Sequence, residues 1–237
     1  MPISKYVFQS WKTRDLPQKM IEHRNAMISL NPSYIYELYI DEDMDRFVDM
    51  YYSGIIAECY HKLNIIVSKV DFWRYLVLYK FGGIYLDMDS EIARPLDSLI
   101  RETDKAIITM EGNPYFFVQW CMMFEAGHPI LKSVIEVVVD NIINNKYPND
   151  VHKMTGPSAF TEGIQKYHQS VFFGELLVNN MDRNCDKTYE VDAETSYRIY
   201  GVDYNGFCNF KHGYVQYLNT SYVNDWREEQ KRKTVLK

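Results

Sequence analysis

Residues 68–89 read SKVDFWRYLVLYKFGGIYLDMD, and this stretch decides the fold of the chain. Apolar side chains recur at helical spacing over residues 64–80 and predict a helix. The two glycines at 82–83 predict its end. Three apolar residues, 84–86, then predict a short buried strand that runs into the acidic tripeptide 87–89. A helix, a glycine turn and a buried strand in this order are typical of a layered α/β fold.

Strands and helices alternate on both sides of this stretch. Apolar and aromatic runs predict strands at 6–8, ending near Trp11, at 34–40 and at 106–110. Helical spacing predicts helices from 17 to 30, within the region up to 62, from 129 to 144 and from 158 to 167. Short strands in the last third follow no pattern that places them. No repeat, low-complexity segment or linker divides the chain, so we expect a single domain over residues 1–237.

The composition indicates a soluble globular protein, since 46% of the 237 residues are hydrophobic and 24% are charged. No run reaches the ~20 apolar residues of a transmembrane helix, and the first residues lack the apolar core of a signal peptide. The formal net charge is -6, so no nucleic-acid partner is expected. Four cysteines without a Cys-x-x-Cys pair disfavour zinc and fit a reducing compartment. We expect a cytoplasmic protein, with peripheral attachment to a membrane left open.

Pairs of aspartates two residues apart are candidates for a metal site. On an extended chain such a pair points to one side and suits a hard divalent cation that shares its other ligands with a diphosphate. The sequence has three pairs, Asp41/Asp43, Asp43/Asp45 and Asp87/Asp89, and the last two are the same tripeptide. The first two superficially suggest a calcium loop, but Arg46 stands where that loop needs glycine and Tyr52 where it needs glutamate. We expect a helix start rich in acidic residues there.

Asp87 and Asp89 stand in a different context. They follow an apolar strand at its carboxyl end, where open α/β sheets bind ligands. Carboxylates beside a buried strand are costly without a cation or another partner. The sequence therefore predicts a site for Mn²⁺ or Mg²⁺ at these two residues.

The predicted helix before them carries two more charged residues, Asp71 and Arg74. Their spacing of three places them on one helical face, and Tyr75 lies four residues from Asp71. An ion pair within the helix is the simplest interpretation of the spacing alone.

The ordered pattern Asp-x-x-Arg-Tyr, Leu-Tyr, Gly-Gly-Ile-Tyr, Asp-x-Asp in residues 68–89 resembles glycosyltransferase family 32, the sugar-binding DXD family. This family includes initiating α-1,6-mannosyltransferases of the fungal Golgi, and the pattern is also similar to the catalytic domains of large clostridial glucosylating toxins. The similarity extends to residues 2–12, 31–41, 119–129 and 155–157. In the last of these, Thr155-Gly156-Pro157, we expect a turn and a helix start.

The resemblance implies a GT-A fold of the nucleotide-diphospho-sugar transferase type, with a mixed central sheet flanked by helices. It implies a retaining, metal-dependent transfer of a hexose from GDP-mannose or a UDP-hexose to a hydroxyl of a glycan or glycolipid. Such an enzyme would serve polysaccharide biosynthesis, and we expect a bacterial or viral enzyme that builds a surface glycan.

The resemblance also implies roles for individual residues. Asp87 and Asp89 would hold the cation against the diphosphate, and Asp71 and Arg74 would bind hydroxyls of the donor sugar. Expected substrate contacts are Trp11, stacked on the base, with Gln9, Ser10, Gly83 and Tyr85 near the donor, Gln119 toward the acceptor and Trp226 over the diphosphate.

The C-terminal segment, from about residue 212 to 237, is expected to complete the site. The family has a His-rich stretch followed by Gly-Ser-Trp at this point, whereas residues 220–226 keep the tryptophan without the histidines. Ser221, Asn224 and His212 are therefore the candidates for a third metal ligand. We expect residues from Asn219 onward to be mobile without donor and ordered with donor and metal.

Two other functions fit the same residues. A nucleotide-sugar hydrolase would use the same metal site with water as the acceptor, and a binding protein would keep the fold without turnover. The presence of all four residues Asp71, Arg74, Asp87 and Asp89 argues against the binding protein, because a degenerate site would have lost some of them.

Overall fold

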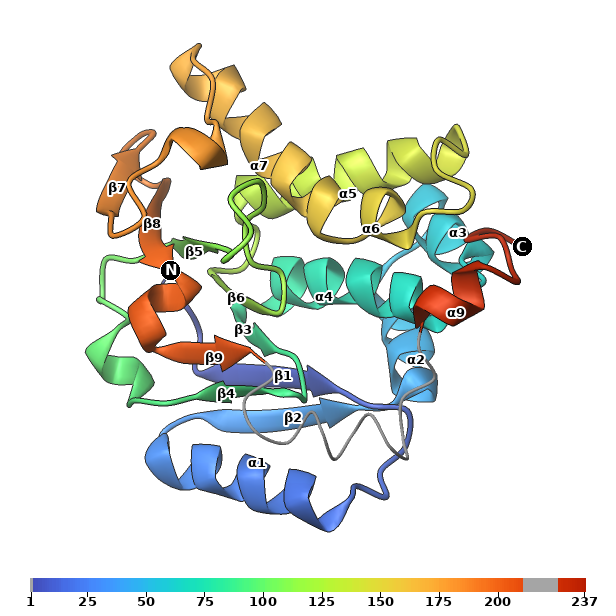
Figure 1. The fold of residues 1–237 in the computed structure, drawn as a ribbon, viewed down its shortest axis with the longest axis horizontal. Coiled ribbons are helices and arrows are strands. Elements are labelled where there is room, and N and C mark those ends of the chain that lie inside the picture. The colour runs from blue at the N-terminus through green and yellow to red at the C-terminus, as the bar shows by residue number, and fades with distance from the viewer. Residues whose placement is uncertain (1, 211–225) are drawn as a thin grey trace.

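A mixed sheet of seven strands forms the centre of the computed structural model, which describes residues 2–210 and 226–237 (Figure 1). The strands are β1 (Tyr6–Ser10), β2 (Ile35–Tyr39), β3 (Gly83–Leu86), β5 (Ala106–Met110), β6 (Cys121–Phe124), β7 (Asp186–Glu190) and β8 (Ser196–Val202). Their order across the sheet is β2-β1-β3-β6-β5-β8-β7. Strand β6 is antiparallel to both neighbours and β7 is antiparallel to β8, whereas the others run in one direction. The carboxyl ends of β1, β2, β3, β5 and β8 therefore share one edge of the sheet.

Both faces of the sheet are covered, as Figure 1 shows. One face packs on α1 (Gln18–Leu30) and on a small second sheet of β4 (Ser90–Ile92) and β9 (Cys208–Phe210). The other face packs on α4 (Ile66–Phe81), with α5 (Pro129–Ile143) and α7 (Pro157–Phe172) beyond it. The remaining helices are α2 (Asp41–Tyr51), α3 (Ile55–Lys62), α6 (Val151–Met154) and α9 (Trp226–Gln230), with single 3-10 turns at Leu96–Ser98, Val178–Asn180 and Asp203–Gly206.

The alternation of side chains along the strands fills these two layers. Val7 and Ile84 face the layer that contains α1, whereas Phe8 and Tyr85 face the layer that contains α4. Because β1 and β3 are in register at these pairs, the residues that follow both strands emerge side by side at the carboxyl edge.

Helix α4 lies between the sheet and α5 (Figure 1). The sequence predicts one broad apolar face, but residues 71–78 are all buried, so the helix is covered on nearly every side. Asp71 and Arg74 consequently lie in the protein interior, where charges are stable only if they are paired.

The glycine turn that ends α4 is required by close packing. Gly82 and Gly83 have φ of 63° and 104°, a region that favours glycine. A Cβ at Gly83 would meet the carbonyl oxygen of Tyr6 at 2.7 Å, and one at Gly82 would meet the Ala126 nitrogen at 2.6 Å. Gly83 therefore allows β3 to start close against β1.

The predicted helices and strands of the first two thirds are confirmed to within a few residues at their ends. The pattern missed β4 and β6, which are short, and it did not place β7, β8 and β9. All four residues of β6 are buried, so their side chains give no alternation of apolar and polar residues.

The acidic cluster at 41–45 is the first turn of α2, as the sequence predicts, and is no calcium loop. Asp43 accepts a hydrogen bond from the Ile40 backbone N–H at 3.2 Å and pairs with Arg14 and Arg46. Asp45 pairs with Lys69 at 2.8 Å. These carboxylates have cap and ion-pair partners that explain them.

The described C-terminal residues are anchored to the core. Val235 is fully buried, its backbone N–H donates to the Pro148 carbonyl at 2.8 Å, and its carbonyl accepts from the Asn64 N–H at 2.7 Å. The basic residues 231–233 are exposed, as expected of a solvated end. Among the helices of residues 2–210 and 226–237, none is both long enough and apolar enough to cross a bilayer.

Candidate functional site

The carboxyl edge of the sheet brings the end of β1 and the end of β3 together. Ser10 ends β1, and its hydroxyl lies 3.4 Å from the hydroxyl of Tyr85 in β3. Asp87 and Asp89 follow β3, and a hydrogen bond of 3.0 Å from the Ser90 N–H to the Asp87 carbonyl turns the chain into β4. Both aspartates are half-buried, and the side chain of Asp87 is 25% exposed.

Arg74 connects α4 to this edge. Its Nη2 lies 3.2 Å from Asp71 Oδ1, and its Nη1 lies 3.4 Å from Asp87 Oδ1. Nη1 also donates to the Gln119 carbonyl at 3.1 Å, and the guanidinium lies 4.4 Å from the centre of the Tyr85 ring. The ion pair within the helix exists, but Arg74 has a second carboxylate partner that helical spacing alone does not predict.

Tyr85 lies behind the first aspartate of the DXD motif. The ring is 1% exposed, and its hydroxyl donates to Asp87 Oδ1 at 2.6 Å. Burial raises the pKa of Tyr85 well above its usual value, so it stays a neutral donor. The resemblance implies a position near the donor for Tyr85, and the structure adds that its hydroxyl holds Asp87 from the interior.

Asp71 is a buried carboxylate with partners from two other segments. It is 4% exposed, and Oδ2 accepts a hydrogen bond from the Thr155 hydroxyl at 3.1 Å. Burial raises the pKa of Asp71 to about 6, although Arg74 and the hydrogen bonds from Thr155 and Gln119 lower it. Burial also acts to lower the pKa of Arg74, but Tyr85, Asp87 and Asp71 outweigh it, so Arg74 remains charged.

Gln119, expected toward the acceptor, belongs to the same buried group. It is 4% exposed, and Nε2 donates to the hydroxyl of Tyr75 and, at 3.5 Å, to the carbonyl of Thr155. The sequence predicts no role in the site for Tyr75 or Thr155. The spacing of Tyr75 from Asp71 is a signal for its place beside that residue, whereas no local signal connects Thr155 to α4.

The remaining residues at the end of β1 face different layers. Trp11 is half-buried and packs with Leu16, Met20, Leu38 and Met88, the central residue of the DXD motif. Gln9 is fully buried on the side of α1, where its Oε1 accepts from Arg24 Nε at 3.1 Å. Trp11 therefore borders the loop of the DXD motif, whereas Gln9 contacts Arg24 of α1. Gly83 lies at the amino end of β3, away from the aspartates.

The residues of the DXD motif suit a hard divalent cation. The described contacts of Asp87 fall on Oδ1, and both aspartates offer carboxylate oxygens, the ligands that Mg²⁺ and Mn²⁺ prefer. Within residues 2–210 and 226–237, no three His, Cys, Asp or Glu side chains converge as a metal-ligand set. Phosphate and water oxygens are further ligands that such a cation accepts.

The predicted C-terminal part of the site is described only in part. His212, Ser221 and Asn224 lie outside the described residues, as does the first part of the proposed mobile segment, residues 219–225. Trp226 begins α9 and is partly buried against the core. The side chain of Gln230 in α9 accepts a hydrogen bond from the Val151 N–H at 3.2 Å, so this helix docks on α6.

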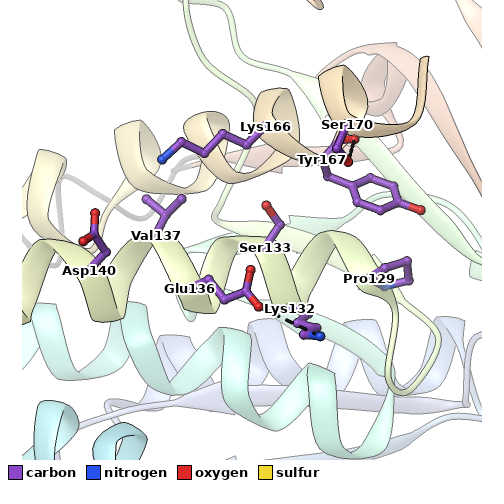
Figure 2. Close-up of a pocket in the computed structure, with 9 residues that line it drawn as sticks. All are labelled: Pro129, Lys132, Ser133, Glu136, Val137, Asp140, Lys166, Tyr167 and Ser170. Carbon is purple, nitrogen blue, oxygen red and sulfur yellow. Dashed lines mark hydrogen bonds and ion pairs between the residues drawn. The ribbon is translucent and has the colours of Figure 1, made fainter. Parts of the chain in front are cut away.

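A surface groove between α5 and α7 lies elsewhere in the molecule (Figure 2). It is lined by Pro129, Lys132, Ser133, Glu136, Val137, Asp140, Lys166, Tyr167 and Ser170. None of the residues expected to bind substrate or metal lines this groove.

Known proteins share both the motif and the fold. The model of the family "Glycosyltransferase sugar-binding region containing DXD motif" matches residues 17–106. Inositol phosphoceramide mannosyltransferase 2 of Schizosaccharomyces pombe is 31% identical over 84% of this chain and 56% of that protein. An initiation-specific alpha-1,6-mannosyltransferase of Candida albicans is 23% identical over 76% of this chain and 57% of that protein. The chain thus spans little more than half the length of these relatives.

Solved structures show the same architecture. The PaToxG glycosyltransferase superposes with a TM-score of 0.58 at 18% identity, covering 72% of this chain and 71% of that chain. The ligand-free glycosyltransferase domain of the YGT toxin gives 0.53 at 8% identity, covering 73% and 79%. The predicted GT-A fold is thereby confirmed. Residues 17–106 therefore carry the glycosyltransferase sugar-binding region with the DXD motif that the sequence indicated, and the mannosyltransferases named above are similar to most of the chain.

Proposed function

We propose that this chain transfers a hexose from a nucleotide diphosphate sugar to a hydroxyl of a glycan or glycolipid, with retention at the anomeric carbon. The observation that carries the proposal is the bridge that Arg74 makes between Asp71 and Asp87 at the carboxyl edge of the sheet. It joins the predicted sugar-binding pair to the predicted metal-binding motif in one site.

Asp87 and Asp89 would hold Mn²⁺ or Mg²⁺ on the solvent side of this bridge. When bound, the cation would neutralise charge on the departing diphosphate. Tyr85 and Arg74 fix Asp87 through Oδ1, so its carboxylate is oriented before the donor arrives.

Asp71 would accept hydrogen bonds from hydroxyls of the donor sugar. An ionised carboxylate has about four acceptor positions, and Arg74 occupies one on Oδ1, Thr155 one on Oδ2, and Gln119 also donates to the group. A remaining position would accept a sugar hydroxyl, and because Arg74 is itself fixed, the carboxylate would orient the sugar. Trp11, at the edge of the same loop, would stack on the base of the donor.

The names of the relatives favour mannose as the transferred sugar. Both are named mannosyltransferases, and one name includes inositol phosphoceramide, an inositol-containing phospholipid. We therefore rank GDP-mannose first and UDP-hexoses second as donors, with a mannoside or an inositol phospholipid as the acceptor class.

A donor and acceptor panel tests the proposal. The protein is incubated with GDP-mannose, UDP-glucose or UDP-galactose and with Mn²⁺ or Mg²⁺, and release of nucleoside diphosphate is measured with and without a mannoside or inositol phosphoceramide. We expect release that depends on metal and increases with acceptor, and a product whose anomeric configuration, measured by NMR, equals that of the donor. If free sugar is released and an added acceptor does not reduce that release, the protein is a hydrolase. If the nucleotide sugar binds but no nucleoside diphosphate is released, it is a binding protein.

A further inference from the structure

The turn Thr155-Gly156-Pro157 lies against the buried face of α4 although it is far away in the sequence. The Thr155 hydroxyl donates to Asp71 Oδ2 at 3.1 Å, across a separation of 84 residues. The Thr155 carbonyl accepts from the Tyr75 hydroxyl at 2.8 Å. Because Asp71 and Tyr75 are one helical turn apart on α4, the helix holds Thr155 at both its side chain and its backbone.

The surroundings leave Thr155 little freedom. The residue is fully buried, and Gln119 Nε2 approaches its carbonyl at 3.5 Å. The next residue needs to be small, because a Cβ at Gly156 would meet the Cα of His152 at 2.9 Å. Pro157 then starts α7, and the ring of Phe160 stacks on Tyr75 with 5.7 Å between centroids. The packing of this turn thus holds the Thr155 hydroxyl beside the Asp71 carboxylate.

We propose that Thr155 is a positioning residue for sugar transfer, whose hydroxyl fixes the carboxylate of Asp71 against Arg74 so that a remaining acceptor position faces the donor sugar. The inference rests on the proposed function of Asp71, and it gives Thr155 a role that a structural turn does not require.

The hydrogen-bond geometry supports this assignment. The hydroxyl of Thr155 has one proton and two nearby acceptors, Asp71 Oδ2 at 3.1 Å and the Val151 carbonyl at 3.4 Å. The carboxylate is both nearer and charged, so it is the stronger acceptor. With Arg74 on Oδ1 and Thr155 on Oδ2, both oxygens of Asp71 are held and rotation of the carboxylate is restricted.

The test removes the Thr155 hydroxyl and then measures whether the resulting loss of activity depends on the carboxylate of Asp71. Thr155→Val keeps the shape of the side chain, Thr155→Ser keeps the hydroxyl, and Thr155→Ala is the second variant without a hydroxyl should valine fail to fold. We expect Thr155→Val to lower kcat for transfer about tenfold or more, and Thr155→Ser to recover most of that loss. Affinity for the nucleoside diphosphate with Mn²⁺, measured by calorimetry, should not change.

A double-mutant cycle separates positioning from folding. In an Asp71→Asn background, replacing Thr155 by valine should cost no further activity, because the carboxylate on which Thr155 acts is gone. Thr161→Val is the matched control, since it removes another buried threonine hydroxyl, which accepts from the Phe117 N–H at 3.0 Å, and should leave kcat near wild type. Equal losses with and without the Asp71 carboxylate, or full activity of Thr155→Val, would overturn the proposal.

A second readout needs no turnover. The carboxyl carbon of Asp71 is titrated by NMR in the donor-free protein; the groups that act on it are Arg74 and Tyr75 of α4, Asp87 after β3, and the neutral donors Thr155 and Gln119. Thr155→Val should raise the titration midpoint and Thr155→Ser should not, whereas an unchanged midpoint would contradict the contact.

If the midpoint moves but no donor is turned over by the wild type, the contact stands and the proposed function fails. If the wild type is active, Asp71→Asn has reduced activity and Thr155→Val is unaffected, the positioning role alone fails.

Discussion

Arg74 Nη1 lies 3.4 Å from Asp87 Oδ1, while Nη2 of the same guanidinium lies 3.2 Å from Asp71 Oδ1. One buried cation thus joins the middle of α4 to the first aspartate of the DXD motif. Because the guanidinium is planar and rigid, the two carboxylates are fixed relative to each other. Changes at any of the three residues should therefore affect the other two.

The two copies of Asp-Met-Asp offer a controlled test of the metal site. Asp87→Asn and Asp89→Asn should each weaken Mn²⁺ binding and abolish most metal-dependent release of nucleoside diphosphate, because each removes a charged oxygen ligand. Asp45→Asn alters the same tripeptide at an ion pair with Lys69 and should leave both properties nearly unchanged. A chelator should remove the activity of the wild type, and added Mn²⁺ or Mg²⁺ should restore it.

The outcome is measured by calorimetric titration of Mn²⁺ in the presence of the nucleoside diphosphate and by turnover. Loss of metal-dependent turnover in Asp45→Asn, with normal behaviour of the variants at 87 and 89, would refute the assignment. Asp43→Asn is expected to retain activity too, but it is the poorer control, since Asp43 also caps α2.

Changes at Asp71 and Arg74 should separate sugar recognition from diphosphate binding. Asp71→Asn keeps the shape of the side chain and should reduce sugar transfer while preserving affinity for the free nucleoside diphosphate. Arg74→Ala leaves two carboxylates without their cation in the interior, so it should also reduce the free energy of unfolding by about 3–5 kcal/mol. Arg74→Lys keeps the charge without the planar fork and is the variant for kinetics. Loss of diphosphate binding in Asp71→Asn would contradict the sugar role.

Trp11→Ala should raise the donor KM more than it lowers kcat. Base stacking on an aromatic ring contributes about 1–3 kcal/mol, which corresponds to a rise in KM of roughly tenfold or more. Since Trp11 also packs on Met20 and Met88, a small loss of thermal stability is expected in addition. Trp11→Phe keeps an aromatic surface and should recover most of the donor affinity. An unchanged KM with a large loss of stability would assign Trp11 to the core alone.

The raised pKa of Asp71 predicts a pH dependence of stability. Burial raises it from 3.8 to about 6, so between these values the folded protein keeps a proton that the unfolded chain has released. The contribution of Asp71 to the free energy of unfolding therefore falls as the pH rises from 4 to 6. Asp71→Asn cannot ionise, so the stability of wild type minus that of this variant should decrease over this range. Chemical denaturation at several pH values tests this, and a constant difference would show that Asp71 titrates normally.

Gly83→Ala should destabilise the protein without any special effect on substrate. The added Cβ would meet the Tyr6 carbonyl at 2.7 Å, and the φ of 104° is itself unfavourable for alanine. Gly112→Ala is the control, because nothing lies within 4 Å of its added Cβ and its φ is not positive. Thermal denaturation of the two variants should show a loss only at Gly83. If Gly83→Ala were stable but had a raised donor KM, the contact with substrate expected from the sequence would stand.

The local stretch 68–89 could be predicted because each of its features is encoded by neighbours in the chain. Helical spacing, two glycines and an apolar run specify α4, the turn and β3, and the position of the aspartates follows directly from the end of the strand. The distinction between the two Asp-Met-Asp tripeptides also depends on adjacent residues. It agrees with the structure, in which Asp43 and Asp45 belong to the start of a helix.

The surroundings of the site could not be predicted in the same way. The protein contacts of Gln9 and Gln119, both expected near the substrate, have no local signal: Gln9 accepts from Arg24 of α1, and Gln119 donates to Tyr75 of α4. The direction in which a strand residue points depends on which layer covers each face, and α1 and α4 are placed only when the sheet is assembled. Strand β6 shows the same limit, since it pairs between β3 and β5 without a pattern of its own.

The sequence by itself determined the order of helix, turn, strand and DXD motif, and the residue types that can hold a cation and a sugar, because these depend on short-range spacing and on side-chain chemistry. Only the tertiary structure decided that Arg74 reaches Asp87, that Tyr85 lies behind the motif, and that Thr155 bonds Asp71 across 84 residues. Burial is the physical reason: a charge or hydroxyl removed from water takes the partners that packing brings within hydrogen-bond distance, and distant segments supply them.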